Sequence, residues 1–171
     1  YRGHSDYRRI EHLDGILLSH AHQDHNGGLG FVRREVPVFT GLMTALIGKG
    51  MQDIINGTGA HESYSYLAPK QVGEGGTIKA VTGLKQARKH VICEPDPVAG
   101  ALDAVRSFLS DHPGKRTTYE PASIDCGDLD ALGLRFFRVD HSIPGSGAFA
   151  IKTPIGWIGY TWAHTRYRDT I

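Results

Sequence analysis

Hydrophobic and polar positions divide this chain into alternating strand-like and helix-like segments. Apolar residues at helical spacing predict a helix over 41–55, a second over 97–110 and a shorter one over 29–35. Apolar runs of strand length separate these helices or follow them, at 13–19, 36–39, 78–82, 90–93, 134–139, 148–152 and 157–160. Strands that alternate with helices and end in closing strands predict an α/β layered domain.

The second long helix has the clearest signals at its ends. Asp96 precedes Pro97, an N-cap residue followed by proline at the first helical position, and the segment 112–114 stops the helix. One face carries Val98, Leu102, Val105 and Leu109, which we expect to pack inward. The opposite face carries Asp103 and Arg106, which we expect in water.

Composition adds limits rather than a function. The chain has 171 residues, of which 40% are hydrophobic and 22% charged, so one globular domain with a real core is expected. No apolar run approaches the roughly 18 residues that span a bilayer, and no signal-peptide pattern opens the chain. Because only two cysteines are present, we expect reduced thiols and a cytoplasmic protein. A net charge of +1 argues neither for nor against a nucleic-acid partner.

Candidate chemistry concentrates in residues 19–28, directly after the first strand. His20 and His22 are two positions apart, so they share a face of the extended chain. Asp24 and His25 follow where the glycine-rich segment 26–28 turns the backbone. Imidazoles and a carboxylate that converge in this way suit zinc or a similar divalent transition ion.

The pattern His20-x-His22-x-Asp24-His25 resembles the HxHxDH signature of the metallo-β-lactamase superfamily. The segment 136–144 is also similar to the one that carries a third metal-binding histidine in the ribonuclease J branch of that superfamily. The resemblance implies that His141 binds the same ion as His20 and His22, while Asp24 and His25 begin a second site. It implies an αββα sandwich, a four-layer α+β arrangement.

The resemblance further implies a metal-dependent hydrolase, most specifically a phosphodiesterase or ribonuclease that uses a metal-activated water. The expected ions are one or two Zn²⁺, with Mn²⁺ as an alternative, and the expected substrate is RNA or another phosphodiester. Asp24 is the candidate catalytic residue, as metal ligand and proton acceptor, and Asp140 or Ser142 are candidates for fixing histidine tautomers. No membrane partner is expected, and a homo-oligomer is an open alternative.

The chain also departs from the family. Members usually read Thr-Gly-Asp after the closing hairpin, and that aspartate bridges two metals, whereas this chain reads Thr161-Trp162-Ala163. The strands before the motif, the RNA-gripping β-CASP domain and the C-terminal part are not in the sequence. Residues 1–171 are therefore expected to be a partial domain, incomplete at both ends. Two alternatives stay open: another superfamily hydrolase, acting on a thioester, lactam or small phosphoester, and a catalytically impaired remnant.

Overall fold

The computed structural model describes residues 12–55, 64–94, 101–111, 118–120, 124–125 and 128–161. The architecture is mixed α/β, as the hydrophobic pattern predicts. The helices are α1 (Gln23–Asn26), α2 (Leu42–Ile55), α3 (Ala101–Ser110) and the 3₁₀ turns η1 (Gly27–Phe31) and η3 (Glu74–Gly76). The strands are β1 (Ile16–Leu18), β2 (Val38–Thr40), β3 (Tyr66–Leu67), β4 (Lys70–Val72), β5 (Ile78–Ala80), β6 (Leu84–Ala87), β7 (His90–Ile92), β8 (Thr118–Glu120), β9 (Ile124–Asp125), β10 (Leu134–Arg138), β11 (Gly147–Thr153) and β12 (Gly156–Tyr160).

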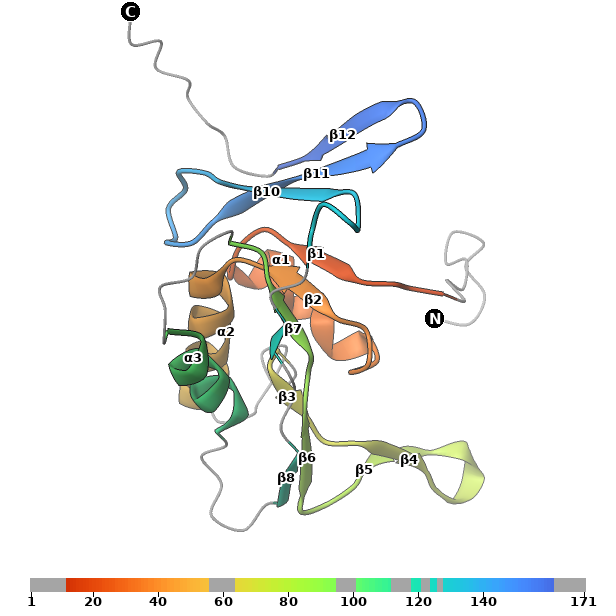
Figure 1. Ribbon diagram of the computed structural model, residues 1–171. Coiled ribbons are helices and arrows are strands. Elements are labelled where there is room, and N and C mark those ends of the chain that lie inside the picture. Colours follow the sequence, from red (N-terminus) through yellow and green to blue (C-terminus); the bar gives the residue numbers. More distant parts are fainter. Residues whose placement is uncertain are drawn as a thin grey trace, which may run out of the picture.

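A parallel sheet with the order β1-β2-β7-β9 forms the centre (Figure 1). Neighbouring residues of β7 serve opposite faces of this sheet, as the period of a strand requires. Ile92 packs with Ala45 of α2 and with Val105 and Leu109 of α3. Val91, by contrast, packs with Phe149 of the second sheet. Burial on both faces explains why these strands read as continuous apolar runs in the sequence.

The second sheet is the antiparallel meander β10-β11-β12, which lies above the central sheet in Figure 1. Phe136 and Phe149 meet edge to face at 5.2 Å between ring centroids and fill the space between the two sheets. The amide of Gly147 donates a hydrogen bond to the carbonyl of Ser19 at 2.8 Å. The start of β11 is thereby fastened to the end of β1, where the metal motif begins.

The lower part of the fold contains pairings that the hydrophobic pattern did not predict. β3, β6 and β8 form a small sheet, and the β4–β5 hairpin projects from it away from the helices (Figure 1). β6 was not expected, because its segment Leu84–Ala87 alternates too weakly to stand out from a loop.

The short helix expected over 29–35 is wrong in position. Helical structure begins earlier, at Gln23, and η1 ends at Phe31, with Val32 already extended. The side-chain amide of Asn26 donates to the carbonyl of Ala21, which starts the turn directly after His22. Gly27, Gly28 and Gly30 then favour a tight 3₁₀ turn over a longer α-helix.

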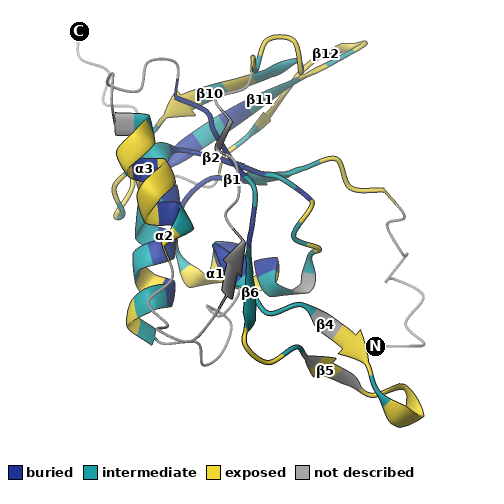
Figure 2. Ribbon diagram, turned by 60° about the horizontal axis from the view of Figure 1, so that its bottom comes forward, coloured by how far each residue is buried: buried dark blue, intermediate teal, exposed yellow. Residues whose placement is uncertain are grey.

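Helix α3 shows the predicted inner face, with one correction. Val105 and Leu109 are buried, Asp103 and Arg106 are exposed, and Leu102 is only half-buried. Val98 and the expected helix start at 97 lie outside the described residues. Figure 2 shows the same division, with buried strands in the centre and exposed residues along the outer side of α3. Across the described ranges, no helix is both long and apolar enough to cross a membrane.

Candidate metal centre

His20 reaches the centre of the molecule because it follows the buried end of β1. Leu18 belongs to the core formed with Leu29, Val38 and Tyr64, and the chain remains buried through Ser19 and His20. The His20 side chain is only 1% exposed. Its Nδ1 lies 2.9 Å from the hydroxyl oxygen of Ser19. Its Nε2 is buried and has no hydrogen-bond partner among the described residues.

The turn after His20 brings His22 and His25 to the same place. His22 is the N-cap of α1, and its carbonyl accepts hydrogen bonds from the amides of His25 and Asn26 at 3.0 Å each. The ring centroid of His22 lies 4.7 Å from that of His20, and the ring centroid of His25 lies 4.1 Å from it. Buried Asn26 fixes this turn through the Ala21 carbonyl at 3.1 Å.

His141 arrives from the loop between β10 and β11. Its ring centroid lies 4.5 Å from that of His20 and 5.1 Å from that of His22. The loop is held against α2, since the hydroxyl of Thr44 donates to the carbonyl of Gly145 at 2.8 Å. Gly145 has φ +80°, and an added Cβ would lie 2.4 Å from the Cβ of Met43, so only glycine fits this approach.

One ring nitrogen from each of His20, His22 and His141 lies within 4.8 Å of the others. Nitrogens bound to one tetrahedral zinc at roughly 2.0–2.1 Å would lie about 3.3 Å apart, so small side-chain rotations close the site. A buried nitrogen without a partner, such as His20 Nε2, is rare in proteins, and a metal ion would supply the missing partner. These residues fit a divalent transition metal ion.

The electrostatics also favour a ligand role for His20. Burial first, and then the neighbouring rings of His25, His141 and His22, lower the pKa of His20 to about 4, while Asp24 opposes this change. His20 is therefore a neutral imidazole near pH 7, the form that binds metals. If Ser19 accepts a hydrogen bond from Nδ1–H, the lone pair of Nε2 remains available.

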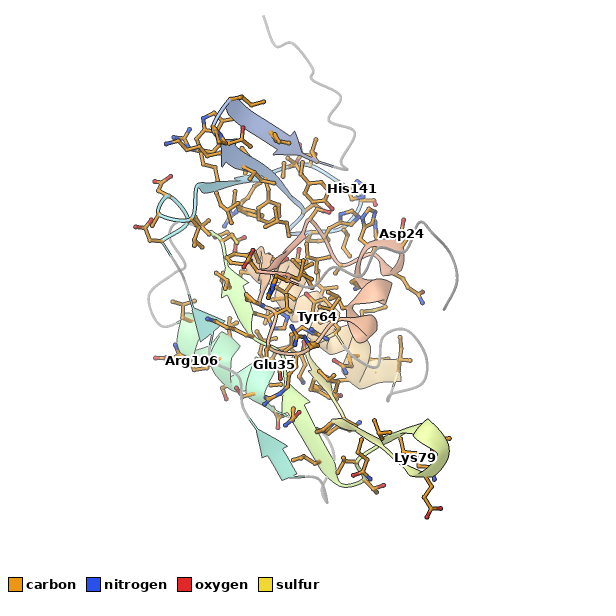
Figure 3. The ribbon with its side chains drawn as sticks, turned by 90° about the vertical axis from the view of Figure 1, so that its right-hand side faces the viewer. Asp24, Glu35, Tyr64, Lys79, Arg106 and His141 are labelled. Carbon is orange, nitrogen blue, oxygen red and sulfur yellow. The ribbon has the colours of Figure 1, made fainter. Side chains whose placement is uncertain are left out.

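Asp24 and His25 lie at the outer rim of this cluster. The side chain of Asp24 is 77% exposed and that of His25 is 12% exposed. Asp24 Oδ2 and His25 Nε2 are 3.5 Å apart, close to the separation of two ligands of one tetrahedral ion. Figure 3 shows Asp24 and His141 on the same side of the molecule. The structure thus gathers all five residues singled out by the sequence, with Asp24 the most exposed.

Sequence reasoning missed residues that hold this centre together. Ser19 contacts His20, whereas the residues expected to fix the tautomers, Asp140 and Ser142, are exposed. Asn26 and Gly145 were also missed as positioning residues. Ser19 could have been found, because it directly precedes the first histidine, but Gly145 carries no sequence signal that distinguishes it from the other glycines.

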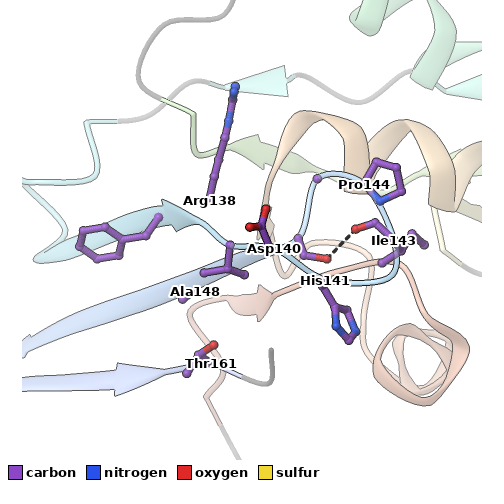
Figure 4. A pocket seen from close by; sticks show the side chains of 11 residues that line it. Arg138, Asp140, His141, Ile143, Pro144, Ala148 and Thr161 are labelled. Carbon is purple, nitrogen blue, oxygen red and sulfur yellow. Dashed lines mark hydrogen bonds between the residues drawn. The ribbon is translucent and has the colours of Figure 1, made fainter. Parts of the chain in front are cut away.

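A cavity of about 780 Å³ lies beside His141 (Figure 4). It is lined by the end of β10, the loop that carries His141, Ala148 and Thr161. An open cavity beside a cluster of metal-ligating residues can admit a substrate. Searches against protein-family models, curated proteins and solved structures find no match to this chain. The case for function therefore rests on the motif and on this geometry.

Proposed function

We propose that this chain is the metal-binding part of a hydrolase of the metallo-β-lactamase type, acting on phosphodiesters and most specifically on RNA. The observation that carries the proposal is the convergence of His20 and His22 with His141, from segments about 120 residues apart, around a buried nitrogen that lacks a partner. The HxHxDH pattern alone would also fit other hydrolases of this superfamily.

The side chains divide the work by burial. His20, His22 and His141 would hold one zinc ion, and Asp24 with His25 would contribute to a second ion, for which Mn²⁺ is an alternative. A bound zinc ion polarises a phosphoryl oxygen and lowers the pKa of a coordinated water to about 7. Buried His20 excludes solvent from the inner side of the site, while exposed Asp24 can accept a proton at its carboxylate.

The arrangement of sheets supports the finer proposal about the fold. The central sheet has α2 and α3 on one face and the β10–β12 sheet on the other, which accounts for three layers of an αββα sandwich. We propose that residues 1–171 are a partial domain of this kind. The free, buried thiol of Cys93 fits a cytoplasmic location.

Metal analysis tests the central claim. After loading with zinc and dialysis, the protein should retain at least about one equivalent, and His22→Ala should lose it. His12→Ala is the matched control, since His12 is exposed. Unchanged zinc content in His22→Ala would contradict the assignment.

Hydrolysis of an RNA oligonucleotide and of bis-p-nitrophenyl phosphate tests the reaction class, with a lactam and a thioester as competing substrates. Ala163 lies outside the described residues, and it stands where the resembling family has a bridging aspartate. If this chain is an impaired remnant, the double change Trp162→Gly and Ala163→Asp should raise phosphodiesterase turnover by about two to three powers of ten. Faster turnover of the lactam or thioester would contradict the phosphodiester proposal.

A further inference from the structure

We propose that Arg138 is a phosphate-binding residue, which holds one phosphate of a single nucleic-acid strand beside the metal centre. This inference rests on the proposed function, because it assumes that the strand is the substrate of the His20–His22–His141 site. It adds a binding residue that neither the HxHxDH pattern nor the metal ligands identify.

The first observation is the position of Arg138 in the cavity. Among the described residues that line it, Arg138 is the one lysine or arginine, and His141 lines the same cavity. Figure 4 shows the Arg138 side chain extending from the end of β10, away from the imidazole of His141. An anion at the metal centre and an anion at Arg138 would therefore be different phosphates of one strand.

The second observation is the way in which Arg138 is held. Its Nε lies 3.5 Å from Oε1 of Glu94, whose side chain is only 5% exposed. The other carboxylate oxygen of Glu94 accepts a hydrogen bond from the amide of Leu42 at the start of α2. This buried carboxylate fixes the inner edge of the guanidinium, while 75% of the Arg138 side chain remains exposed. A guanidinium oriented in this way can donate paired hydrogen bonds to a phosphate.

The other side chains in the cavity favour a strand over a small phosphoester. Phe137 is 49% exposed and lines the cavity, so its ring can stack on a base. Asp140 also lines the cavity, and its exposed carboxylate repels an incoming phosphate. Asp140 therefore limits affinity, and its removal should strengthen binding of an anionic strand.

Arg135 provides a matched control for Arg138. It lies on the same strand but on the opposite face, because the two residues are three positions apart. Its guanidinium lies 4.6 Å from the ring centroid of Trp157, and it does not line the cavity. Arg135→Gln removes the same charge from the same sheet, outside the proposed path of the strand.

The experiment measures binding of a fluorescently labelled ten-nucleotide oligoadenylate to the zinc-loaded protein by anisotropy, over a range of salt concentrations. Arg138→Gln should weaken binding about tenfold and lower the slope of log affinity against log salt by about 0.7, the share of one phosphate contact on a single strand. Arg135→Gln should stay within about twofold of wild type, Phe137→Ala should weaken binding, and Asp140→Asn should tighten it.

If Arg138 serves only to neutralise Glu94, Arg138→Gln would change the thermal midpoint and leave the salt slope unchanged, which would overturn the proposal. Equal losses in Arg138→Gln and Arg135→Gln would overturn it too. Zinc content separates the two proposals. A chain that retains zinc but shows no Arg138-dependent binding contradicts the phosphate role alone, whereas a chain that does not retain zinc contradicts the proposed function.

Discussion

At the scale of single residues, the neighbour of His20 controls its chemistry more than its spacing from His22 does. Spacing places two imidazoles on one face, but a metal ion needs a particular ring nitrogen with its lone pair free. The Ser19 hydroxyl, 2.9 Å from His20 Nδ1, can hold the proton on that nitrogen and leave the buried Nε2 unprotonated. Residues in this supporting position typically influence metal affinity nearly as strongly as ligands do.

We therefore expect Ser19→Ala to weaken zinc binding by about 10- to 100-fold, because the imidazole of His20 loses the group that fixes its tautomer. Competition with a chromophoric chelator measures this affinity. Ser65→Ala is the matched control, since the Ser65 hydroxyl is equally buried but has no hydrogen-bond partner among the described residues. Equal zinc affinities in the two variants would show that Ser19 does not act on the site.

At the scale of elements, the loop between β10 and β11 brings His141 to the other histidines. Packing against α2 holds this loop, and Gly145 is where the two backbones approach most closely. Gly145→Ala would add both an unfavourable positive φ and a clash with Met43. We expect a loss of about 2 to 5 kcal/mol in the free energy of unfolding, together with weaker zinc binding.

Gly75→Ala separates these two effects. Gly75 has φ +70°, but no atom lies within 4 Å of an added Cβ, so only the backbone penalty applies. We expect a loss of about 1 to 2 kcal/mol and unchanged zinc affinity. Urea denaturation and the chelator titration measure both quantities, and equal losses in the two glycine variants would exclude the proposed contact with α2.

Helix α3 supports the central sheet through its buried positions. Leu109→Ala should lower the free energy of unfolding by about 2 to 5 kcal/mol, because Leu109 is 5% exposed in the core with Ala45 and Ile92. Leu102→Ala should lose less, since Leu102 is only half-buried. Leu132→Ala is a surface control at 57% exposure. Denaturation curves that rank Leu102 above Leu109 would mean that the orientation of the helix is wrong.

At the scale of the whole molecule, buried histidines couple stability to pH. Burial lowers the pKa of His90 to about 4, against an ordinary value of 6.5, and the positive charge of Arg88 acts in the same direction, while the Arg88 carbonyl opposes it. Between these values the unfolded chain binds a proton that the folded chain does not. The free energy of unfolding should therefore fall as the pH drops from 6.5 to 4, by up to about 1.4 kcal/mol per pH unit from this residue.

Urea denaturation of the zinc-free protein at several pH values checks this dependence. His20, whose pKa is also lowered to about 4, contributes with the same sign. His90→Phe keeps a ring beside Tyr64 but removes the titrating group, so its profile should be flatter over this range. A profile as steep as that of the wild type would show that His90 does not cause the acid sensitivity.

The sequence by itself determined what depends on neighbouring residues. Helical spacing defined α2 and the inner face of α3, and the segment 153–156 marked the turn between β11 and β12. The positions of His20, His22, Asp24 and His25 were sufficient to single out one end of β1. These features follow from the periods of helices and strands and from turn chemistry, which act over a few residues.

Only the tertiary structure decided what depends on residues far apart in the chain. The pairing of β6 with β3 and β8, the 3₁₀ turn after Asn26 and the contact of Gly145 with α2 depend on packing partners that local patterns do not encode. The same holds for the pKa of His20, which is set by burial and by rings that fold against it. Local patterns named the histidines, and packing between the two sheets placed His141 beside His20, because one side chain can reach another only where the chain folds back on itself.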